Sequence, residues 1–128
     1  MSVAPQAPGR HLLIECSGPH AHLDAAALDA LMRRAAAAGG AHVLASHMHA
    51  FGSGGGVTGV VLLAESHITV HTWPERDYAA FDVFMCGRCD AEAAAAVIAE
   101  AAGATVEIRS LERRTPAVAV SDPQGCAA

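Results

Sequence analysis

The chain has 128 residues, 52 % of them apolar, and a formal net charge of −5 at pH 7. This length is enough for one soluble domain with a substantial core, but not for two independent domains. The acidic balance argues against nucleic acid as a partner, because phosphates demand a basic face, and it weakly favours cationic small molecules.

The sequence contains eight arginines and no lysine. No side-chain amine is therefore present that could form a Schiff base with pyridoxal phosphate or with a substrate carbonyl. Any imine chemistry would need another source of the carbonyl or the amine.

The two ends of the chain differ in composition from its middle. Residues 1–9 predict a flexible leader and the stretch from Arg113 onward predicts a disordered tail, which leaves a single domain over residues 10–112. The N-terminal stretch MSVAPQAPGR lacks the apolar segment of a signal peptide or membrane anchor. A cytoplasmic location without membrane attachment is therefore expected.

The first half of the domain predicts a strand, a helix and a second strand. Residues 11–16 (HLLIEC) read as a strand, and residues 42–51 (HVLASHMHAF) alternate as another. Between them, residues 23–38 have leucines and a methionine at helical spacing, and Gly39-Gly40 provides the stop.

The second half predicts further strands and one more helix. A GSGGG loop at 52–56 precedes an apolar strand at 57–64, which is followed by HITVHTW at 67–73, and residues 78–86 form the next strand. Asp90 can cap a helix that runs to about Ala102, and residues 105–111 alternate as a final strand.

The predicted order is β-α-β-β-β-α-β, with short connections that favour an antiparallel sheet. Two amphipathic helices can cover only one face of such a sheet. The expected fold is therefore of the α+β class, a two-layer α/β sandwich with both helices on one face. The other face must be polar or must meet a partner.

The segment HITVHTW carries unusual polarity for a strand. Period-two alternation places His67, Thr69 and His71 on one face and Ile68 and Val70 on the other. A solvated sheet face with histidines at its rim would explain any single one of these residues. The combination with the flanking residues needs a further explanation.

Residues 65–87 read ESHITVHTWPERDYAAFDVFMCG, and this stretch resembles the prokaryotic S-adenosylmethionine decarboxylase proenzymes. The family signature has an E-S-H cleavage site, then H-T-W-P-E, then a Y-A-A-x-D-x-F-x-C-G segment. GRHLLIE near the start and VTGVVLLAES before the signature extend the resemblance. It implies a two-layer sandwich, a homodimer with sites at the interface, and a role in polyamine (spermidine) biosynthesis.

The resemblance also implies self-cleavage between Glu65 and Ser66. The Ser66 hydroxyl would attack the carbonyl of Glu65, the amide would become an ester, and elimination followed by hydrolysis would turn Ser66 into a covalent pyruvoyl group. This ketone can form the Schiff base with the substrate's own amine and act as the electron sink after carbon dioxide leaves. It would account for the absence of lysine.

Three further roles follow from the resemblance. His71 matches the processing histidine that removes the Ser66 Cα proton. Thr58 stands where the family has a serine whose hydroxyl stabilises the cleavage intermediate. Cys86 matches the cysteine that protonates the product carbon, although a buried apolar thiol is the ordinary reading of such a residue.

The spacing along the segment adds a constraint. Ser66 and His71 are five positions apart, so on one extended strand their Cα atoms would be separated by about 16 Å, too far for direct proton transfer. We expect a composite site across a two-fold dimer, with Ser66 and Cys86 from one protomer and Thr58 and His71 from the other.

Three residues are suited to binding the nucleoside. Phe51 and Trp73 offer flat apolar surfaces for adenine, and Glu75 offers a carboxylate for the ribose diol. Trp73 could equally be a core residue. The glycine loop beside Phe51 leaves ornithine or arginine open as substrates of a pyruvoyl enzyme on the same scaffold.

Two non-enzymatic readings complete the set. The C-x-x-C at 86–89 could bind zinc together with HMH at 47–49 or HAH at 20–22, but one such pair is a weak signal and no metal is predicted. An uncleaved homologue acting as a regulatory partner is the other, and the intact Glu65, Ser66, His71 and Cys86 argue against it.

Overall fold

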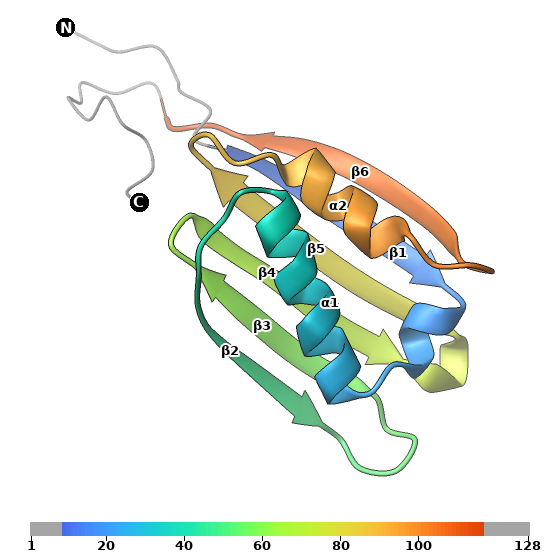
Figure 1. Ribbon diagram of the computed structural model, residues 1–128. Coiled ribbons are helices and arrows are strands. Elements are labelled where there is room, and N and C mark those ends of the chain that lie inside the picture. The colour runs from blue at the N-terminus through green and yellow to red at the C-terminus, as the bar shows by residue number, and fades with distance from the viewer. Residues whose placement is uncertain (1–8, 117–128) are drawn as a thin grey trace, which may run out of the picture.

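The structure is a computed structural model that describes residues 9–116, and its elements form two layers (Figure 1). The strands within these residues are β1 (Gly9–Ser17), β2 (Val43–Ala50), β3 (Val57–Leu63), β4 (Ser66–Trp73), β5 (Tyr78–Cys86) and β6 (Thr105–Arg113). The helices are α1 (Ala25–Ala38), α2 (Ala91–Ala99) and the short 3₁₀ helices η1 (Pro19–His22) and η2 (Pro74–Arg76).

The strands form one sheet in the order β2-β3-β4-β5-β1-β6, and every pair of neighbours is antiparallel. Both helices lie on the same face of this sheet (Figure 1), α1 in contact with β2 and β3 and α2 in contact with β1 and β5. The α+β class and the two-layer sandwich with an antiparallel sheet are therefore confirmed.

The sheet contains one strand more than the predicted order. The stretch 57–73 divides at Ala64 and Glu65, because Leu63 pairs with Ser66 across a two-residue hairpin turn. Short hairpin turns usually contain glycine or asparagine, and neither residue occurs at this turn. The sequence pattern therefore predicted one strand where the structure has two, β3 and β4.

Side-chain caps begin both helices. The Asp24 carboxylate accepts a hydrogen bond from the backbone N–H of Ala27, and Asp90 does the same for Ala93. Helix α1 consequently starts at Ala25, two residues after the predicted start, and α2 ends at Ala99, three residues before the predicted end. The helix boundaries were the least predictable part of each element.

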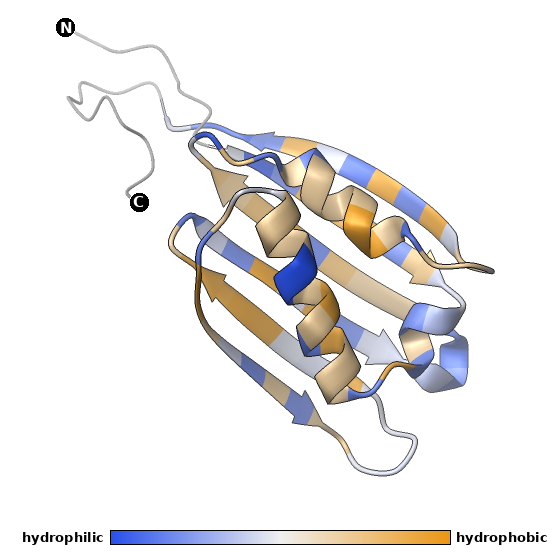
Figure 2. Cartoon of the chain, viewed as in Figure 1, coloured by the Kyte–Doolittle hydropathy of each residue, from blue (hydrophilic) through white to orange (hydrophobic). Residues whose placement is uncertain are grey.

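The core lies between the helices and one side of each strand. Alternation is visible as changing hydropathy colour along the strands in Figure 2. The largest fully buried side chains include Leu12, Ile14, Leu28, Met32, Ile68, Phe81 and Ile98. We call the sheet face opposite the helices the open face; in β4 it carries His67, Thr69, His71 and Trp73, none of which is fully buried.

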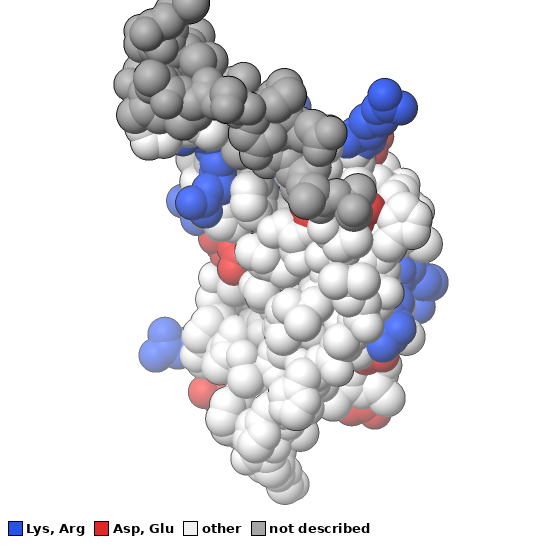
Figure 3. Space-filling model, turned by 90° about the vertical axis from the view of Figure 1, so that its left-hand side faces the viewer, with Lys and Arg blue, Asp and Glu red and all other residues white. Residues whose placement is uncertain are grey.

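Charge is distributed without a basic patch on the face shown in Figure 3, where acidic and basic side chains lie around the border. None of the helices within residues 9–116 is long and apolar enough to span a membrane. The predicted leader and tail fall mainly outside the described residues, since β1 begins at Gly9 and β6 ends at Arg113.

Candidate active site

The bond between Glu65 and Ser66 lies where the β3–β4 hairpin turn enters β4. Ser66 has a backbone φ of 135°, a region that residues with a side chain rarely adopt. Such a conformation costs on the order of 1–3 kcal/mol and persists when the surroundings over-determine it. Pairing of Ser66 with Leu63 on one side and Met85 on the other holds it in place.

The carbonyl oxygen of Glu65 is held by the end of β5. The backbone N–H of Cys86 donates a hydrogen bond to it at 3.2 Å, and the Sγ of Cys86, which is disulfide-bonded and so has no proton to donate, lies 3.1 Å from the same oxygen. Hydrogen-bond donors fixed at a carbonyl oxygen stabilise the negative charge that develops when a nucleophile attacks its carbon. The turn therefore presents an already polarised carbonyl to the neighbouring hydroxyl.

The side chain of Glu65 is anchored by His42, which immediately precedes β2. The backbone N–H of His42 donates to Oε1 at 2.9 Å, and its ring Nδ1 lies 2.7 Å from Oε2. These two bonds lower the pKa of the Glu65 carboxyl despite its burial, so the side chain is ionised at neutral pH. The residue on the acyl side of the bond is thus fixed through both its main chain and its side chain.

The Ser66 hydroxyl has an imidazole as its partner. Ser66 Oγ lies 2.9 Å from Nδ1 of His67, whose ring meets the Phe84 ring edge to face at 5.9 Å between centroids. Burial lowers the pKa of His67, and the charge of nearby His11 lowers it further, which favours a neutral ring at pH 7. A neutral imidazole can accept a proton from the hydroxyl.

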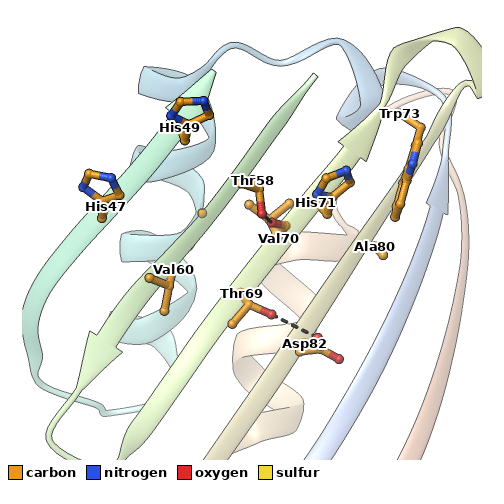
Figure 4. Close-up of a pocket in the computed structure, with 11 residues that line it drawn as sticks. His47, His49, Thr58, Val60, Thr69, Val70, His71, Trp73, Ala80 and Asp82 are labelled. Carbon is orange, nitrogen blue, oxygen red and sulfur yellow. Dashed lines mark hydrogen bonds between the residues drawn. The ribbon is translucent and has the colours of Figure 1, made fainter. Parts of the chain in front are cut away.

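A pocket of about 500 Å³ opens on the open face, some distance along the strands from the hairpin turn (Figure 4). Within it, Thr69 Oγ1 donates a hydrogen bond to Asp82 Oδ2 at 3.0 Å. Residues of β2, β3, β4 and β5 line it: His47, His49, Thr58, Gly59, Val60, Thr69, Val70, His71, Trp73, Ala80 and Asp82.

A row of rings borders this pocket. The Phe51 centroid lies 6.0 Å from that of His71, and His71 lies 4.2 Å from Trp73. Trp73 in turn stacks on Tyr78 at 5.0 Å with an interplanar angle of 12°. Trp73 is only partly buried and Phe51 is exposed, so both rings leave apolar surface for a planar ligand.

The structure divides the predicted catalytic residues into two groups. Thr58 and His71 are direct partners in the β3–β4 register, and both line the pocket. Ser66 and Cys86 lie at the hairpin turn, five positions away along β4. The predicted separation of Ser66 from His71 is therefore present.

The predicted substrate-binding residues fall into three positions. Trp73 lines the pocket, whereas Phe51 lies at its border through contact with the His71 ring. Glu75 is exposed in η2 and does not belong to the lining. Of the three predicted substrate-binding residues, only Trp73 therefore belongs to the lining of the pocket.

The contacts of two important side chains were not predicted from the sequence. His42 is 23 residues from Glu65 in sequence, and no local pattern links the two. His67 was placed on the open face by alternation, but its bond to Ser66 depends on the unusual backbone of Ser66, which no motif announces.

The predicted zinc alternative has no support in the described part of the chain, where no group of three His, Cys, Asp or Glu side chains could hold a metal ion. The C-x-x-C begins at the end of β5, whereas His47 and His49 lie on β2, three strands away in the sheet. His20 is buried with Nε2 2.6 Å from the carbonyl oxygen of Ile98.

Comparison with known proteins links this arrangement to one family. The family model described as S-adenosylmethionine decarboxylase matches residues 10–114. An S-adenosylmethionine decarboxylase proenzyme of Caldanaerobacter subterraneus subsp. tengcongensis is 47 % identical over 81 residues, which cover 62 % of this chain and 64 % of that protein. The chain thus spans less than two thirds of the length of this relative.

Another relative aligns over almost its whole length. The proenzyme of the same name from Parasynechococcus marenigrum is 44 % identical over 118 residues, covering 89 % of this chain and 91 % of that protein. The crystal structure of the adenosylmethionine decarboxylase from Aquifex aeolicus superposes with a TM-score of 0.66 at 32 % identity, over 81 % of this chain and 90 % of that one.

Proposed function

The chain belongs to the S-adenosylmethionine decarboxylase family, and from this premise we propose that it cleaves itself between Glu65 and Ser66 and then decarboxylates S-adenosylmethionine. The observation that carries this proposal is the hairpin turn itself. It combines a strained Ser66, a carbonyl oxygen held by Cys86 and a hydroxyl bonded to an imidazole.

Cleavage begins when Ser66 Oγ attacks the carbonyl carbon of Glu65. The carbon–nitrogen bond breaks, the acyl group moves to oxygen, and the Cys86 N–H supports the charge on the carbonyl oxygen. His71 then removes the Ser66 Cα proton, so that the ester breaks by elimination and Glu65 leaves as a carboxylate. Addition of water and loss of ammonia convert the remaining residue to the pyruvoyl group.

The elimination step requires two copies of the chain. His71 and Thr58 share one position in the sheet register, five residues from Ser66 along β4. A separation of about 16 Å along an extended strand prevents direct proton transfer within one chain. A two-fold homodimer brings Thr58 and His71 of a second copy to the Ser66 of the first.

Once formed, the pyruvoyl ketone would supply the carbonyl group for a Schiff base with the substrate amine, so no lysine is needed. It would also accept the electron pair released with carbon dioxide. The surrounding residues fit that group, because it replaces Ser66 where the strand is already fixed by pairing on both sides. Cys86, at the end of β5, is disulfide-bonded in this structure, so it would return a proton to the product carbon once reduced to the thiol.

The ring row favours S-adenosylmethionine over ornithine or arginine as the substrate. Phe51 and Trp73 offer surfaces for an adenine base, and neither linear amino acid has a planar base to place there. Glu75, exposed on η2 two positions after Trp73, is the carboxylate that we assign to the ribose hydroxyls. The product would be the aminopropyl donor of spermidine synthesis.

The substrate is tested by measuring carbon dioxide release from S-adenosylmethionine, ornithine and arginine in parallel, with the Ser66→Ala variant as the blank. We expect release from S-adenosylmethionine alone, and none above background from the variant, which cannot form the ketone. Faster release from ornithine or arginine would contradict the proposed substrate and leave the cleavage chemistry untouched.

A further inference from the structure

The strand that begins at the cleavage site places a second histidine next to the nucleophile. We propose that His67 is a catalytic residue of the self-cleavage, acting as the base that takes the Ser66 hydroxyl proton and as the acid that returns it to the leaving nitrogen. This inference rests on the proposed function and assigns to a residue of the same chain the first step of processing.

The contact between the hydroxyl and the ring is direct. Ser66 Oγ lies 2.9 Å from His67 Nδ1, within the range of an O–H···N hydrogen bond. The ring is partly buried and rests edge to face against Phe84, whose centroid is 5.9 Å away. A ring so placed keeps Nδ1 aimed at the hydroxyl rather than at solvent.

The electrostatic surroundings are consistent with a base. The charged and titratable groups near His67 are His11 on β1, Asp82 on β5 and Arg113 on β6. Desolvation is the largest influence on the pKa of His67 and lowers it, which favours the neutral ring. In the tautomer that carries its proton on Nε2, Nδ1 can take the proton that Ser66 Oγ loses.

The acyl shift needs no proton from outside the site. As the oxygen–carbon bond forms, the hydroxyl proton moves to Nδ1 and the negative charge moves to the Glu65 oxygen, where the Cys86 N–H donates to it. When the carbon–nitrogen bond breaks, the proton passes from Nδ1 to the Ser66 nitrogen. The product is an ester with a free amine, and no proton is gained or lost.

This assignment separates the two histidines by step. His67 would serve the acyl shift inside one chain, whereas His71 would serve the later elimination. Hydroxylamine at neutral pH cleaves esters but not ordinary peptide bonds, so it reveals whether a variant has completed the first step.

The experiment compares His67→Asn, His67→Ala and His71→Ala proenzymes on denaturing gels, with and without hydroxylamine. Asparagine keeps a hydrogen-bonding group near the Nδ1 position but cannot take up the proton. We expect both His67 variants to cleave at least 100-fold more slowly than the unaltered chain and to resist hydroxylamine, in line with the about 10²–10⁴-fold contribution of general acid–base catalysis. We expect the His71 variant to be split by hydroxylamine.

His22→Asn is the control, because it changes an exposed histidine on η1 that pairs with Asp77 at the end of the sheet opposite Ser66, and it should cleave at the normal rate. Added imidazole should partly restore cleavage of His67→Ala, which a purely structural role would not allow. Circular dichroism of His67→Asn verifies its fold.

Two results would overturn the role of His67. One is cleavage of the folded His67→Asn chain within about twofold of the normal rate. The other is an uncleaved His67→Asn chain that hydroxylamine splits, which would show that the acyl shift proceeds without the imidazole. A failure of the unaltered chain to cleave would instead contradict the proposed function.

Discussion

The Glu65 side chain illustrates how a single residue can serve both stability and chemistry. Its carboxylate is tied to the backbone and ring of His42, while its carbonyl is the group to be attacked. Rigid attachment on both sides keeps the scissile bond in one orientation relative to the Ser66 hydroxyl. Positioning of this kind supplies a substantial part of the rate of an intramolecular reaction.

The anchored carboxylate predicts a pH dependence of stability. Its pKa is lowered from 4.5 in the folded chain, so its stabilising effect is present above the unfolded pKa and is lost as the pH falls through the folded value. In an uncleavable Ser66→Ala background, we expect the free energy of unfolding to fall between pH 5 and pH 3, and Glu65→Gln to flatten this decline.

Urea unfolding at each pH measures the effect. At pH 7 the Glu65→Gln substitution should lower the free energy of unfolding by about 1–3 kcal/mol, the usual range for weakening bonds to a buried charged group. Glu107→Gln, an exposed position on β6, is the control and should change little. An equal effect of the two substitutions would contradict the anchoring role.

At the level of elements, the loop between β2 and β3 determines where Phe51 lies. The backbone N–H of Phe51 donates to the Gly56 carbonyl at 3.0 Å, and the N–H of Val57 donates to Thr72 Oγ1 at 2.9 Å. These bonds tie the glycine-rich loop to the end of β4. The flexibility expected from GSGGG is therefore restricted at its last residue.

Gly56 tests this attachment. Its φ is 84°, and a Cβ at that position would approach the Thr72 carbonyl oxygen to 2.3 Å, so the backbone would have to move. Gly54 has a similar φ of 73° but open space around it. We expect Gly54→Ala to cost about 1–2 kcal/mol from the left-handed backbone alone, and Gly56→Ala to cost more because it adds a steric clash.

Thermal unfolding of both glycine variants gives the comparison, again in the uncleavable background. A larger fall in Tm for Gly56→Ala than for Gly54→Ala would support the attachment of the loop. Equal falls would show that the contact with Thr72 is not maintained in solution.

The elements themselves were largely predictable, because alternation and helical spacing report which side of each segment is buried. The hairpin at Ala64 and Glu65 was not, since its residues lack the usual turn signals and are shaped by pairing with both neighbours. The site residues were likewise predictable only in part. Ser66, His71 and Cys86 could be assigned from the signature, whereas the bonds of His42 and His67 arise only when the chain has folded.

At the level of the whole molecule, the open face leaves one side of the sheet without helices. It carries the pocket, and Leu62 and Leu111 are half exposed among the apolar side chains outside the core. A second copy packed there would cover these residues and bring His71 near a Ser66 that it cannot reach in its own chain.

Co-expression of Ser66→Ala with His71→Ala tests this composite site. In a mixed dimer, the intact Ser66 of one chain meets the intact His71 of the other, so we expect the His71→Ala chain to be cleaved only when Ser66→Ala is present. In each mixed dimer, one of the two chains carries Ser66 and can be cleaved. Continued absence of cleavage in verified mixed dimers would contradict the composite site.

The central claim is that the bond before Ser66 breaks spontaneously, and the mass of the intact folded protein tests it most directly. We expect two polypeptides, residues 1–65 and 66–128, the second lighter by one ammonia than the same fragment beginning with serine. A single unbroken chain of 13.0 kDa in fresh, folded protein would contradict the account.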